Sequence, residues 1–396
     1  MVEFSAIPSI VKENLSKKKF YLYESLLISV IVFLIMINLS YFRINPIVEI
    51  SPPIITRTMS TRSIVNTTSI NLDERLCNEI RNNRRQFNGS NHPCDRIVCT
   101  IVVHSSGGRL GNRMFMFASA YGLARTHGCR LYAARQIFDQ LSSNFNMSMK
   151  KDFWFSHRDA NSIRDAKIIK TTCKFLPDLL KPNAFQRIEL QGYWQSYLYF
   201  DTFREEIRQM YSATKDTLSR LANYFASITK NDCTNCSIPA HGTHDELRRN
   251  IRTNYNITWI GIHIRLTDFR RLEYASDEQY IVRSMSIYRR RFRKKKLRFL
   301  IASDDKPFCE KVFASGQDAE QVFVLPEYFP PMDDLMTLAF CHHSIVTGGT
   351  YSFWAAYLAG GDVIHDTSCP TACSSSNYYP PWFQLMGQPK EKLEDK

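Results

Sequence analysis

The stretch RIVCTIVVHSSGGRLGNRMFMFASAYGLARTHGCRLYAA, residues 96–134, decides the fold. It starts with a β-branched run, 96–104, which is typical of a strand buried on both faces. A glycine-rich loop follows, and then apolar residues at helical spacing that end at Gly128, a residue suited to end a helix. The segment CRLYAA (129–134) can form a second strand. A strand, a helix and a strand in this order predict a βαβ unit and therefore a parallel sheet.

The same alternation returns in the second half of the chain. The expected strands there are 259–265, 297–303, 321–325, 343–349 and 362–365, and the expected helices are 275–293, a short one from about 306, 332–341 and 350–360. Between the two regions we expect a strand with an aromatic-rich end in 186–200, helix in 201–228 and a polar, loop-like segment in 229–254. Two βα-repeating halves with a junction near 229–256 predict an α/β protein with two Rossmann-like subdomains facing a cleft. In such sheets ligands bind beyond the carboxyl ends of the strands.

The N-terminal segment differs in composition from the rest of the chain. Lysines at 17–19 precede an apolar run, 25–42, of roughly 18 residues, close to the ~20 that cross a bilayer. The run lacks a small-residue cleavage site and the lysines precede it, so we expect an uncleaved signal anchor with the first residues in the cytoplasm. A buried core helix is the alternative. The expected organisation is a cytoplasmic tail (1–19), a transmembrane signal anchor (20–42), a Pro-, Ser- and Thr-rich stem (43–92) and a lumenal catalytic domain (93–396).

Cysteines and sequons agree with a lumenal domain. All 11 cysteines lie between Cys77 and Cys373, as an oxidising compartment permits, and the odd number leaves at least one free or paired between chains. Five glycosylation sequons begin at Asn66, Asn88, Asn146, Asn235 and Asn256. Cys233 and Cys236 have the spacing of half a zinc site, but no second pair of suitable spacing accompanies them, so a disulfide is favoured over a metal. Cys369 and Cys373 are interpreted in the same way.

The formal net charge of +13 favours anionic partners. The basic run RRRFRKKK, 289–296, lies between an expected helix and an expected strand. Because the domain should face the lumen, we expect a solvated basic face there, with an acidic glycan or partner as the alternative, and no nucleic-acid partner.

Unusual polar clusters follow four of the expected strands. These clusters are Gly107-Gly108-Arg109-Leu110-Gly111-Asn112, Arg265 with Asp268, Ser303-Asp304-Asp305, and Gly348-Gly349-Thr350-Tyr351-Ser352. Glycines let a backbone approach a ligand closely, and the amides at a helix N-terminus suit an anion. Four such clusters at one edge predict a phosphate-bearing ligand, most simply a nucleotide. Independent structural caps, such as an ion pair of Arg265 with Asp268, are the alternative.

Five segments resemble the ordered motifs of the α1,2-fucosyltransferase family. They are GRLGNRMFMFASAYGLA, LQGYWQSYLYF, GIHIRLTDF, FLIASDD and GGTYSFWAAYLAGG, within residues 96–366. The family's H-x-R-R-x-D motif, which is shared with α1,6- and protein O-fucosyltransferases, is matched by His263, Arg265 and Asp268. Leu266 replaces the second arginine, which removes one cation or hydrogen-bond donor near the sugar nucleotide.

The resemblance implies a GT-B-type fold and a Golgi type II membrane enzyme. Its reaction would transfer L-fucose from GDP-fucose to the 2-hydroxyl of a terminal galactose on a glycan, with inversion at C1 and no metal or other cofactor. The rivals are a transferase of other linkage or acceptor that uses the same donor machinery, and a catalytically silent membrane-anchored lectin or chaperone, which Leu266 favours and the intact Arg265 and Asp268 oppose. The acceptor and the oligomeric state stay open.

Roles for the site residues follow from this resemblance. Arg265 would stabilise charge that develops on the β-phosphate. Gly108, Arg109 and Asn112 would hold the nucleotide sugar or shape the cleft from the other half. The hydroxyls of Thr350 and Ser352 and the amides around Gly349 would assist Arg265. Asp268 is either the general base or the residue that orients Arg265.

The remaining assignments leave alternatives open. Asp304 or Asp305 would recognise the guanine or the ribose, with a metal site as the alternative. His263 is either a satisfied core residue or a ligand contact. Tyr193 and Trp194 either pack in the core or stack on the acceptor sugar.

Overall fold

The computed structural model describes residues 99–149, 155–156, 167–182, 184–230, 242–253, 256–272, 275–315, 320–366 and 373–383. All of them belong to one compact unit, Thr68–Lys396. The expected tail, signal anchor and stem, and the pair Cys233 and Cys236, lie outside these residues. Within the described ranges, no helix combines the length and the apolar character that crossing a bilayer requires.

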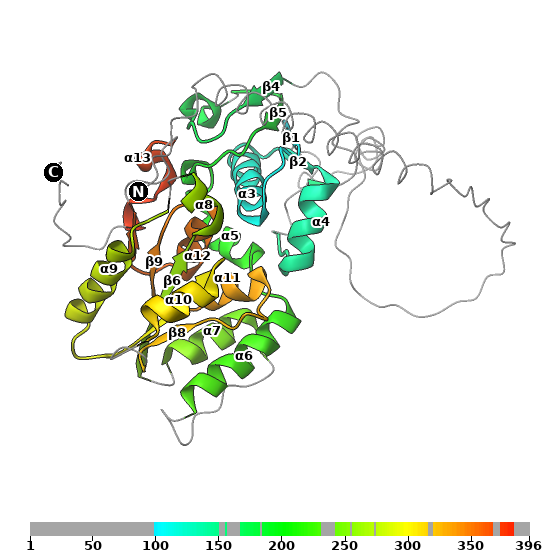
Figure 1. Ribbon diagram of the computed structural model, residues 1–396. Coiled ribbons are helices and arrows are strands. Elements are labelled where there is room, and N and C mark those ends of the chain that lie inside the picture. Colours follow the sequence, from blue (N-terminus) through cyan, green and yellow to red (C-terminus); the bar gives the residue numbers. More distant parts are fainter. Residues whose placement is uncertain are drawn as a thin grey trace, which may run out of the picture. The chain divides into compact units, whose positions relative to one another are not determined.

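The first half of the unit is built on a five-stranded parallel sheet in the order β3-β2-β1-β5-β4. Its strands are β1 (Thr100–Val103), β2 (Arg130–Ala133), β3 (Phe155–Ser156), β4 (Lys167–Lys170) and β5 (Arg187–Gln191). The helix α3 (Leu110–His127) connects β1 to β2 and packs beside both strands (Figure 1). It ends as expected at Gly128, which has a left-handed φ of 67° and donates its N–H to the carbonyl of Ala124. The predicted βαβ unit is therefore confirmed.

The second half has a five-stranded parallel sheet in the order β10-β9-β6-β7-β8. The strands are β6 (Ile257–Ile264), β7 (Lys296–Ser303), β8 (Val322–Val324), β9 (His343–Val346) and β10 (Val363–His365), and the helices between them are α8 (Thr267–Arg271), α9 (Glu278–Arg291), α10 (Lys306–Phe313), α11 (Pro331–Ala339) and α12 (Thr350–Ala359). The predicted alternation of strands and helices in this half is confirmed.

The two faces of the second sheet belong to different hydrophobic cores because successive side chains of a strand point to opposite faces. Ile260, Ile262 and Ile264 join a core that is covered by α9 and α10. Trp259 lies in the other core, which also takes in α11 and α12 and continues into α3 and the first sheet. The side-by-side helices α6 (Lys215–Thr229) and α7 (His244–Thr253) cover the same face (Figure 1). One continuous core therefore joins the two halves.

The shorter elements connect these parts. They are α4 (Arg135–Asn144), η3 (Pro177–Leu180), η4 (Tyr197–Tyr199), η5 (Asp201–Phe203), α5 (Arg204–Met210), α13 (Ser375–Tyr378) and η7 (Pro381–Phe383). Among the described residues, the disulfide Cys99–Cys129 joins the segments that precede β1 and β2, and Cys173–Cys373 ties the first half to the C-terminal segment before α13, while Cys309 and Cys341 are free and buried. The segment 201–228 is helical as expected and is divided into η5, α5 and α6, where Thr214 caps α6 by accepting from the amide of Thr217 at 3.4 Å.

The expectation of a loop over 229–254 is wrong for residues 244–253, which form the helix α7. Leu247 and Ile251 are the buried apolar residues of this helix, and their spacing of four on one face of a charged segment is a helical signal that the polar composition obscured. Two arginines add hydrogen bonds that hold the helix. Arg248 donates to the carbonyl of Ala359, and Arg252 donates to the carbonyls of Phe340 (3.1 Å) and Ala359 (2.9 Å). These carbonyls belong to the ends of α11 and α12, so charged side chains hold α7 in place where apolar ones usually do.

Three histidines of this half are held neutral by their hydrogen bonds. Each accepts a backbone N–H at Nδ1: His244 from Ala213 (3.1 Å), His342 from Trp259 (3.0 Å) and His343 from Asp362 (3.1 Å). Burial lowers the pKa of each to about 4. Protonation would remove the lone pair that accepts the bond, so the folded state disfavours the charged form.

We expect acidification to destabilise the protein through these groups. The folded-state pKa lies below the unfolded value of about 6.5, so the unfolded state binds more protons below that pH and stability falls as the pH falls. Each histidine contributes a slope of about 1.4 kcal/mol per pH unit below ~6.5. Urea unfolding of the full chain between pH 7 and pH 5.5 measures the slope. His342→Gln keeps an acceptor and a donor without titrating and should reduce the slope by about a quarter or less, because burial also lowers the pKa of His263 to about 4 and that of His365; an unchanged slope would contradict this explanation.

Candidate functional site

A cavity of about 970 Å³ opens at the carboxyl ends of the strands and is lined from both halves. The first half contributes Gly108, Arg109, Asn112, Tyr193 and Gln195, and the second contributes His263, Arg265, Asp268, Asp304, Gly349, Thr350 and Tyr351, among others. In the second sheet the chain runs from β6 to β7 and β8 on one side and from β9 to β10 on the other. The cavity therefore lies where β6 and β9 diverge, the place at which such sheets bind ligands.

Two helices begin at the cavity and touch each other there. Gly111 of α3 lies so close to α12 that a Cβ at this position would stand 2.7 Å from Oγ1 of Thr350 and 2.8 Å from the backbone nitrogen of Tyr351. Thr350 donates to Oδ1 of Asn112 at 2.9 Å, and the indole N–H of Trp354 donates to the carbonyl of Gly111 at 3.0 Å. The approach brings two helix N-termini, each preceded by a glycine turn, to one cavity wall, which suits an anionic ligand.

The glycine turns use conformations that other residues avoid. Gly108 has a φ of 82° and Gly349 a φ of 95°. A Cβ on Gly108 would stand 2.5 Å from Nδ2 of Asn112, so the turn packs directly on the side chain that contacts α12. The residues expected to hold a ligand from the first half are thus brought together with Thr350.

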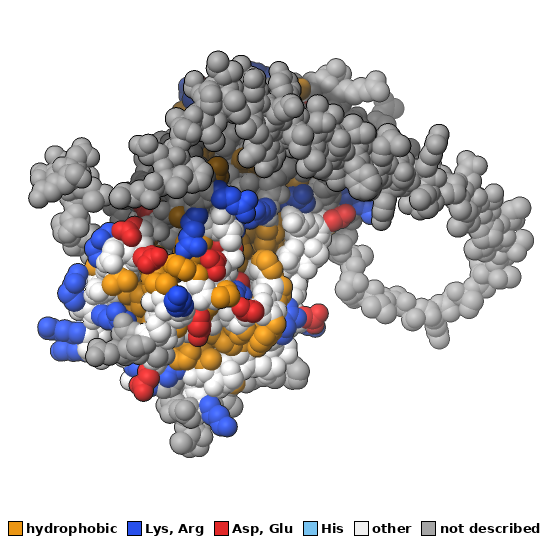
Figure 2. Space-filling model, in the orientation of Figure 1, with side chains coloured by type: hydrophobic (Ala, Val, Ile, Leu, Met, Phe, Trp, Pro, Cys, Tyr) orange, Lys and Arg blue, Asp and Glu red, His pale blue; other side chains and the backbone are white. Residues whose placement is uncertain are grey.

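Arg265 is fixed by two carboxylates at the end of β6. Its Nε and Nη2 donate to the two oxygens of Asp268 at 2.7 and 2.8 Å, and its Nε lies 3.3 Å from Oδ2 of Asp304. Its backbone N–H donates to Oγ1 of Thr347 at 3.0 Å. Among the described residues no partner engages Nη1, so this nitrogen is available to a ligand. In Figure 2, Lys and Arg side chains gather around α8, which follows Arg265, with Asp and Glu among them.

Asp268 has the geometry of an orienting group. The hydrogen bonds from Arg265 are the main reason that its pKa is lowered, so it is ionised at neutral pH. Both of its oxygens are occupied by Arg265, and Nη2 of Arg109 lies 3.4 Å from Oδ2. Because both oxygens are bound to Arg265 and the pKa is lowered, Asp268 is a weak base, which favours orientation of Arg265 over general-base chemistry.

Asp304 and Asp305 have different positions. Asp304 lines the cavity and accepts from the amides of Leu266 (2.8 Å) and Thr267 (3.3 Å), so it caps the start of α8. Asp305 is not part of the cavity lining; it accepts from the amide of Phe308 at 3.2 Å, which caps α10, and it pairs with Arg270. Both carboxylates thus have structural partners. Across the described ranges, no three His, Cys, Asp or Glu side chains are grouped as a metal site would require.

His263 is both a satisfied core residue and part of the cavity wall. Its Nδ1 lies 2.5 Å from Oγ of Ser352, whose own proton goes to the carbonyl of Gly348 at 2.9 Å. His263 must therefore donate from Nδ1, which leaves Nε2 as an acceptor. Burial lowers the pKa of His263 to about 4, so the ring is neutral. Ser352 is buried and acts through His263, since it does not line the cavity itself.

Leu266, at the place of the second motif arginine, points away from the cavity. Its side chain is buried in the core beneath α9 and α10, and only its backbone N–H takes part in the site, through Asp304. Arg109 approaches Asp268 from the first half, so a second guanidinium is present near the same carboxylate. The spacing of the motif did not predict this arrangement.

One further acid at the cavity, Asp334, and its buried neighbour Asp333 were not singled out from the sequence. Asp334 lines the cavity, and burial raises its pKa to about 6 although Lys306 lies 2.9 Å away. Its neighbour Asp333 is fully buried and accepts from Arg220 at both oxygens. The signal was a pair of acids in the first turn of the helix expected at 332–341. Tyr193 lines the cavity, whereas Trp194 is fully buried and packs in the core.

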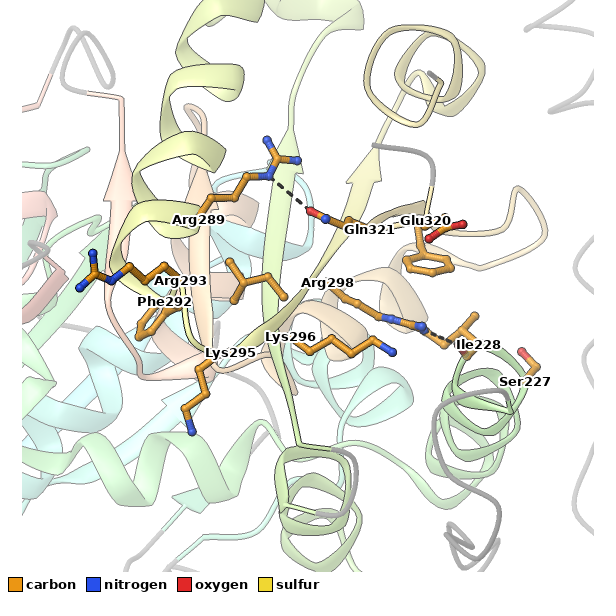
Figure 3. A pocket seen from close by; sticks show the side chains of 12 residues that line it. Ser227, Ile228, Arg289, Phe292, Arg293, Lys295, Lys296, Arg298, Glu320 and Gln321 are labelled. Atoms are coloured by element: carbon orange, nitrogen blue, oxygen red, sulfur yellow. Dashed lines mark hydrogen bonds between the residues drawn. The ribbon is translucent and has the colours of Figure 1, made fainter. Parts of the chain in front are cut away.

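The basic run lies far from this cavity. A separate cavity of about 850 Å³ at the amino ends of β7 and β8 is lined by Arg289, Arg293, Lys295, Lys296 and Arg298. Figure 3 shows Arg289 reaching Gln321 and Arg298 reaching the carbonyl of Ile228. The run precedes β7, whereas Ser303 at the other end of that strand lines the first cavity, so eight residues, or roughly 23 Å, separate the two.

The family of the chain follows from a match that spans all the described residues. The model of glycosyl transferase family 11 matches residues 99–383. The chain belongs to this family. The match takes in both sheets and every residue of the cavity, and it confirms the resemblance drawn from the sequence motifs.

Curated relatives agree with this assignment. Galactoside 2-alpha-L-fucosyltransferase SEC1 of Bos taurus is 24% identical over 275 residues, 67% of this chain and 66% of the relative. Galactoside alpha-(1,2)-fucosyltransferase 1 of Rattus norvegicus is 27% identical over 279 residues, 65% of this chain and 64% of the relative. The chain thus spans just under two thirds of the length of these relatives. The solved structure of the fucosyltransferase NodZ from Bradyrhizobium aligns with a TM-score of 0.38 and 12% identity, over 65% of this chain and 92% of NodZ.

We expect Gly111→Ala to destabilise this family 11 site. The added methyl group would press on the backbone of α12, which cannot move without separating the two helix starts, and overpacking of this kind costs about 1–3 kcal/mol. Urea unfolding of the full chain measures the loss. Gly242→Ala is the matched control, because its Cβ would meet only the flexible side chain of Glu246, at 3.2 Å. Equal stability of the two variants would show that the helix starts do not depend on their close approach.

Proposed function

We propose that this chain transfers L-fucose from GDP-fucose to the 2-hydroxyl of a terminal galactose on a glycan, with inversion at C1. Family membership and the activities named in its relatives support the reaction class. The observation that carries the proposal is the cavity wall itself: Arg265, held by two carboxylates, faces the same space as the N-termini of α3 and α12. In this proposal the two parallel sheets form a GT-B-type pair of Rossmann-like halves.

The proposed chemistry stabilises the departing diphosphate. The bond between fucose C1 and the β-phosphate oxygen breaks, the galactose O2 bonds to C1 from the opposite face, and the hydroxyl proton leaves to water. Negative charge grows on the β-phosphate, where Nη1 of Arg265 and the amides that follow Gly349 can donate hydrogen bonds. Because these donors are fixed before the ligand arrives, they need no reorganisation during the reaction.

Several described residues argue against a dedicated carboxylate base. Asp268 and Asp304 use their oxygens to hold Arg265 and α8, and Asp334 is paired with Lys306. His263 offers an acceptor at Nε2, but its low pKa makes it a weak base. We therefore propose a loose transition state in which the C1–O bond is largely broken before the acceptor deprotonates. The cationic donors supply the electrostatic stabilisation, so we propose that the transfer needs no metal.

The proposed location is the Golgi membrane, with a single type II span and the catalytic domain in the lumen. The apolar run 25–42 after the lysines at 17–19 supports the anchor. The disulfides Cys99–Cys129 and Cys173–Cys373 support an oxidising compartment. A silent relative is less favoured, because Leu266 points into the core and Arg109 places a second cation at Asp268.

We expect fucose transfer to galactose-terminated acceptors to resist EDTA and to be lost in Arg265→Ala. Removal of a preorganised donor of this kind lowers kcat by about 10²–10³. The assay uses the full-length chain in detergent with GDP-fucose and identifies the product linkage. Arg271→Ala is the matched control, because Arg271 is an exposed arginine of α8 that does not line the cavity. Linkage at another hydroxyl would refute the acceptor assignment, and no turnover of GDP-fucose with any acceptor would refute the donor assignment.

We expect Asp268→Asn to weaken the binding of GDP as well as the transfer. Without the carboxylate, Arg265 loses two charge-assisted hydrogen bonds, each of which contributes about 1.5–3 kcal/mol. It also loses its fixed orientation. Calorimetric titration with GDP, in the absence of acceptor, separates the two roles of Asp268. An unchanged Kd for GDP together with lost transfer would identify Asp268 as the base and overturn the orienting role.

A further inference from the structure

A second, smaller pocket adjoins the cavity at the carboxyl ends of β1, β4 and β5. Its volume is about 500 Å³, and it is lined by His104, Ser105, Ser106, Lys170, Thr172, Gln191, Gly192 and Tyr193. Thr172 and Tyr193 also line the large cavity, so the two spaces share a wall. We refer to this smaller space as the side pocket. The two spaces therefore lie side by side.

The side pocket lies where the strands of the first sheet diverge. The chain runs from β1 to β2 and β3 on one side of β1, whereas β5 and β4 lie on the other. The residues that follow β1 and β5 therefore border an opening at their carboxyl ends, as those after β6 and β9 do in the second sheet. The second sheet's opening holds Arg265, which serves the donor in the proposed function. The opening of the first sheet can then serve the acceptor.

The lining of the side pocket offers uncommitted polar groups. Within the described part of the chain, no side-chain hydrogen bond or ion pair engages the hydroxyls of Ser105, Thr172 and Tyr193 or the ammonium of Lys170. A sugar ring presents several hydroxyls at its rim, which need this mixture of donors and acceptors. Its C–H face packs on an aromatic ring, and Tyr193 lies where the two spaces meet. The chemistry of the lining thus suits a neutral sugar.

Tyr193 is held by a rigid backbone. It stands between Gly192, with a φ of 91°, and Trp194, with a φ of 52°. A Cβ on Gly192 would stand 2.1 Å from the carbonyl oxygen of Thr171, so the turn admits no larger residue. The Trp194 carbonyl accepts from Ser119 at 2.8 Å, and the Cys173–Cys373 disulfide fixes the residue next to Thr172. A platform fixed in this way costs little entropy when a ligand binds.

We propose that the side pocket binds the second sugar of the acceptor glycan, the one joined to the galactose that receives the fucose. The inference rests on the proposed function, which sets the orientation of the acceptor glycan relative to the donor. The galactose 2-hydroxyl must face the donor in the large cavity, and the shared wall of Thr172 and Tyr193 leads from there to Lys170. The second sugar then packs on Tyr193 and accepts a hydrogen bond from Lys170. The enzyme therefore acts on glycans of two or more sugars in preference to galactose alone.

The test compares acceptors of one and two sugars. The full-length chain in detergent is assayed with GDP-fucose and either methyl β-galactoside or lactose. We expect a KM for lactose about tenfold lower, at similar kcat. Lys170→Ala should remove most of this advantage and leave the KM for methyl β-galactoside unchanged. Lys167→Ala is the matched control, because Lys167 is the exposed lysine at the opposite end of the same strand and does not line the pocket.

Tyr193 provides a second, independent variant. Tyr193→Phe keeps the aromatic ring and should retain most of the preference for lactose, whereas Tyr193→Ala should lose it. Equal KM values for the two acceptors in the unaltered chain, or a lactose preference that persists in Lys170→Ala, would overturn the inference while the proposed function stands.

A binding measurement separates the inference from the proposed function. Saturation-transfer NMR with lactose and the full-length chain, without donor, reports contact with the second sugar. We expect signals from both rings in the unaltered chain, and a weaker signal from the second ring in Lys170→Ala than in Lys167→Ala. If fucose is never transferred but this pattern is seen, the proposed function fails and the pocket remains a glycan site. Absence of signal from the second ring overturns the inference in either case.

Discussion

The contact between the starts of α3 and α12 is the constraint on which the site depends. Gly111 has no side chain, and this alone lets the two helices approach until Thr350 bonds Asn112 and Trp354 bonds the Gly111 carbonyl. Because the helices belong to different sheets, their contact sets where the carboxyl ends of the two sheets face each other. It also places two helix N-termini, each with a partial positive charge, at one wall of the cavity. The buried contacts behind them offset the repulsion between these two charges. The cavity is therefore a consequence of how the halves are joined.

Much of this fold could be predicted because its signals are local. The strands β1 and β6 consist largely of β-branched residues, and Ile260, Ile262 and Ile264 repeat at the period of a strand with a different core on each face. The glycines at 107, 108 and 349 adopt positive φ. The glycine-rich turns before the two helices could therefore be predicted from the residue types alone. The carboxyl ends of parallel strands meet at one edge, and this geometric rule brought Arg265, Asp268 and Thr350 together before any contact was known.

Other features of the fold and the site could not be predicted, because they depend on contacts between segments that are far apart in the sequence. The helix α7 is held by Arg248 and Arg252, whose partners are carbonyls more than 80 residues away. Asp304 and Asp305 are adjacent in the chain, yet one caps α8 beside the cavity and the other caps α10 outside it. Leu266 occupies the position of a motif arginine, but its side-chain direction follows from the turn into α8. In each case the residue type was visible in the sequence, and its role was set by a partner that the sequence does not place.

The charge balance of the cavity explains how Arg265 can be largely buried and still bind a ligand. Arg265 has a side chain only 18% exposed, and a lone guanidinium there would be costly to desolvate. Asp268 and Asp304 compensate it while they take only Nε and Nη2. Two carboxylates around one arginine leave the local charge negative, so Arg109 and the helix ends are needed before a diphosphate can be attracted. Because Arg109 belongs to the first half and Asp268 to the second, an anion-binding charge balance is reached only when the two halves are together. Leu266 lies in the core beneath α9 and α10 and supplies no charge to the cavity, so this requirement falls on the contact between the halves.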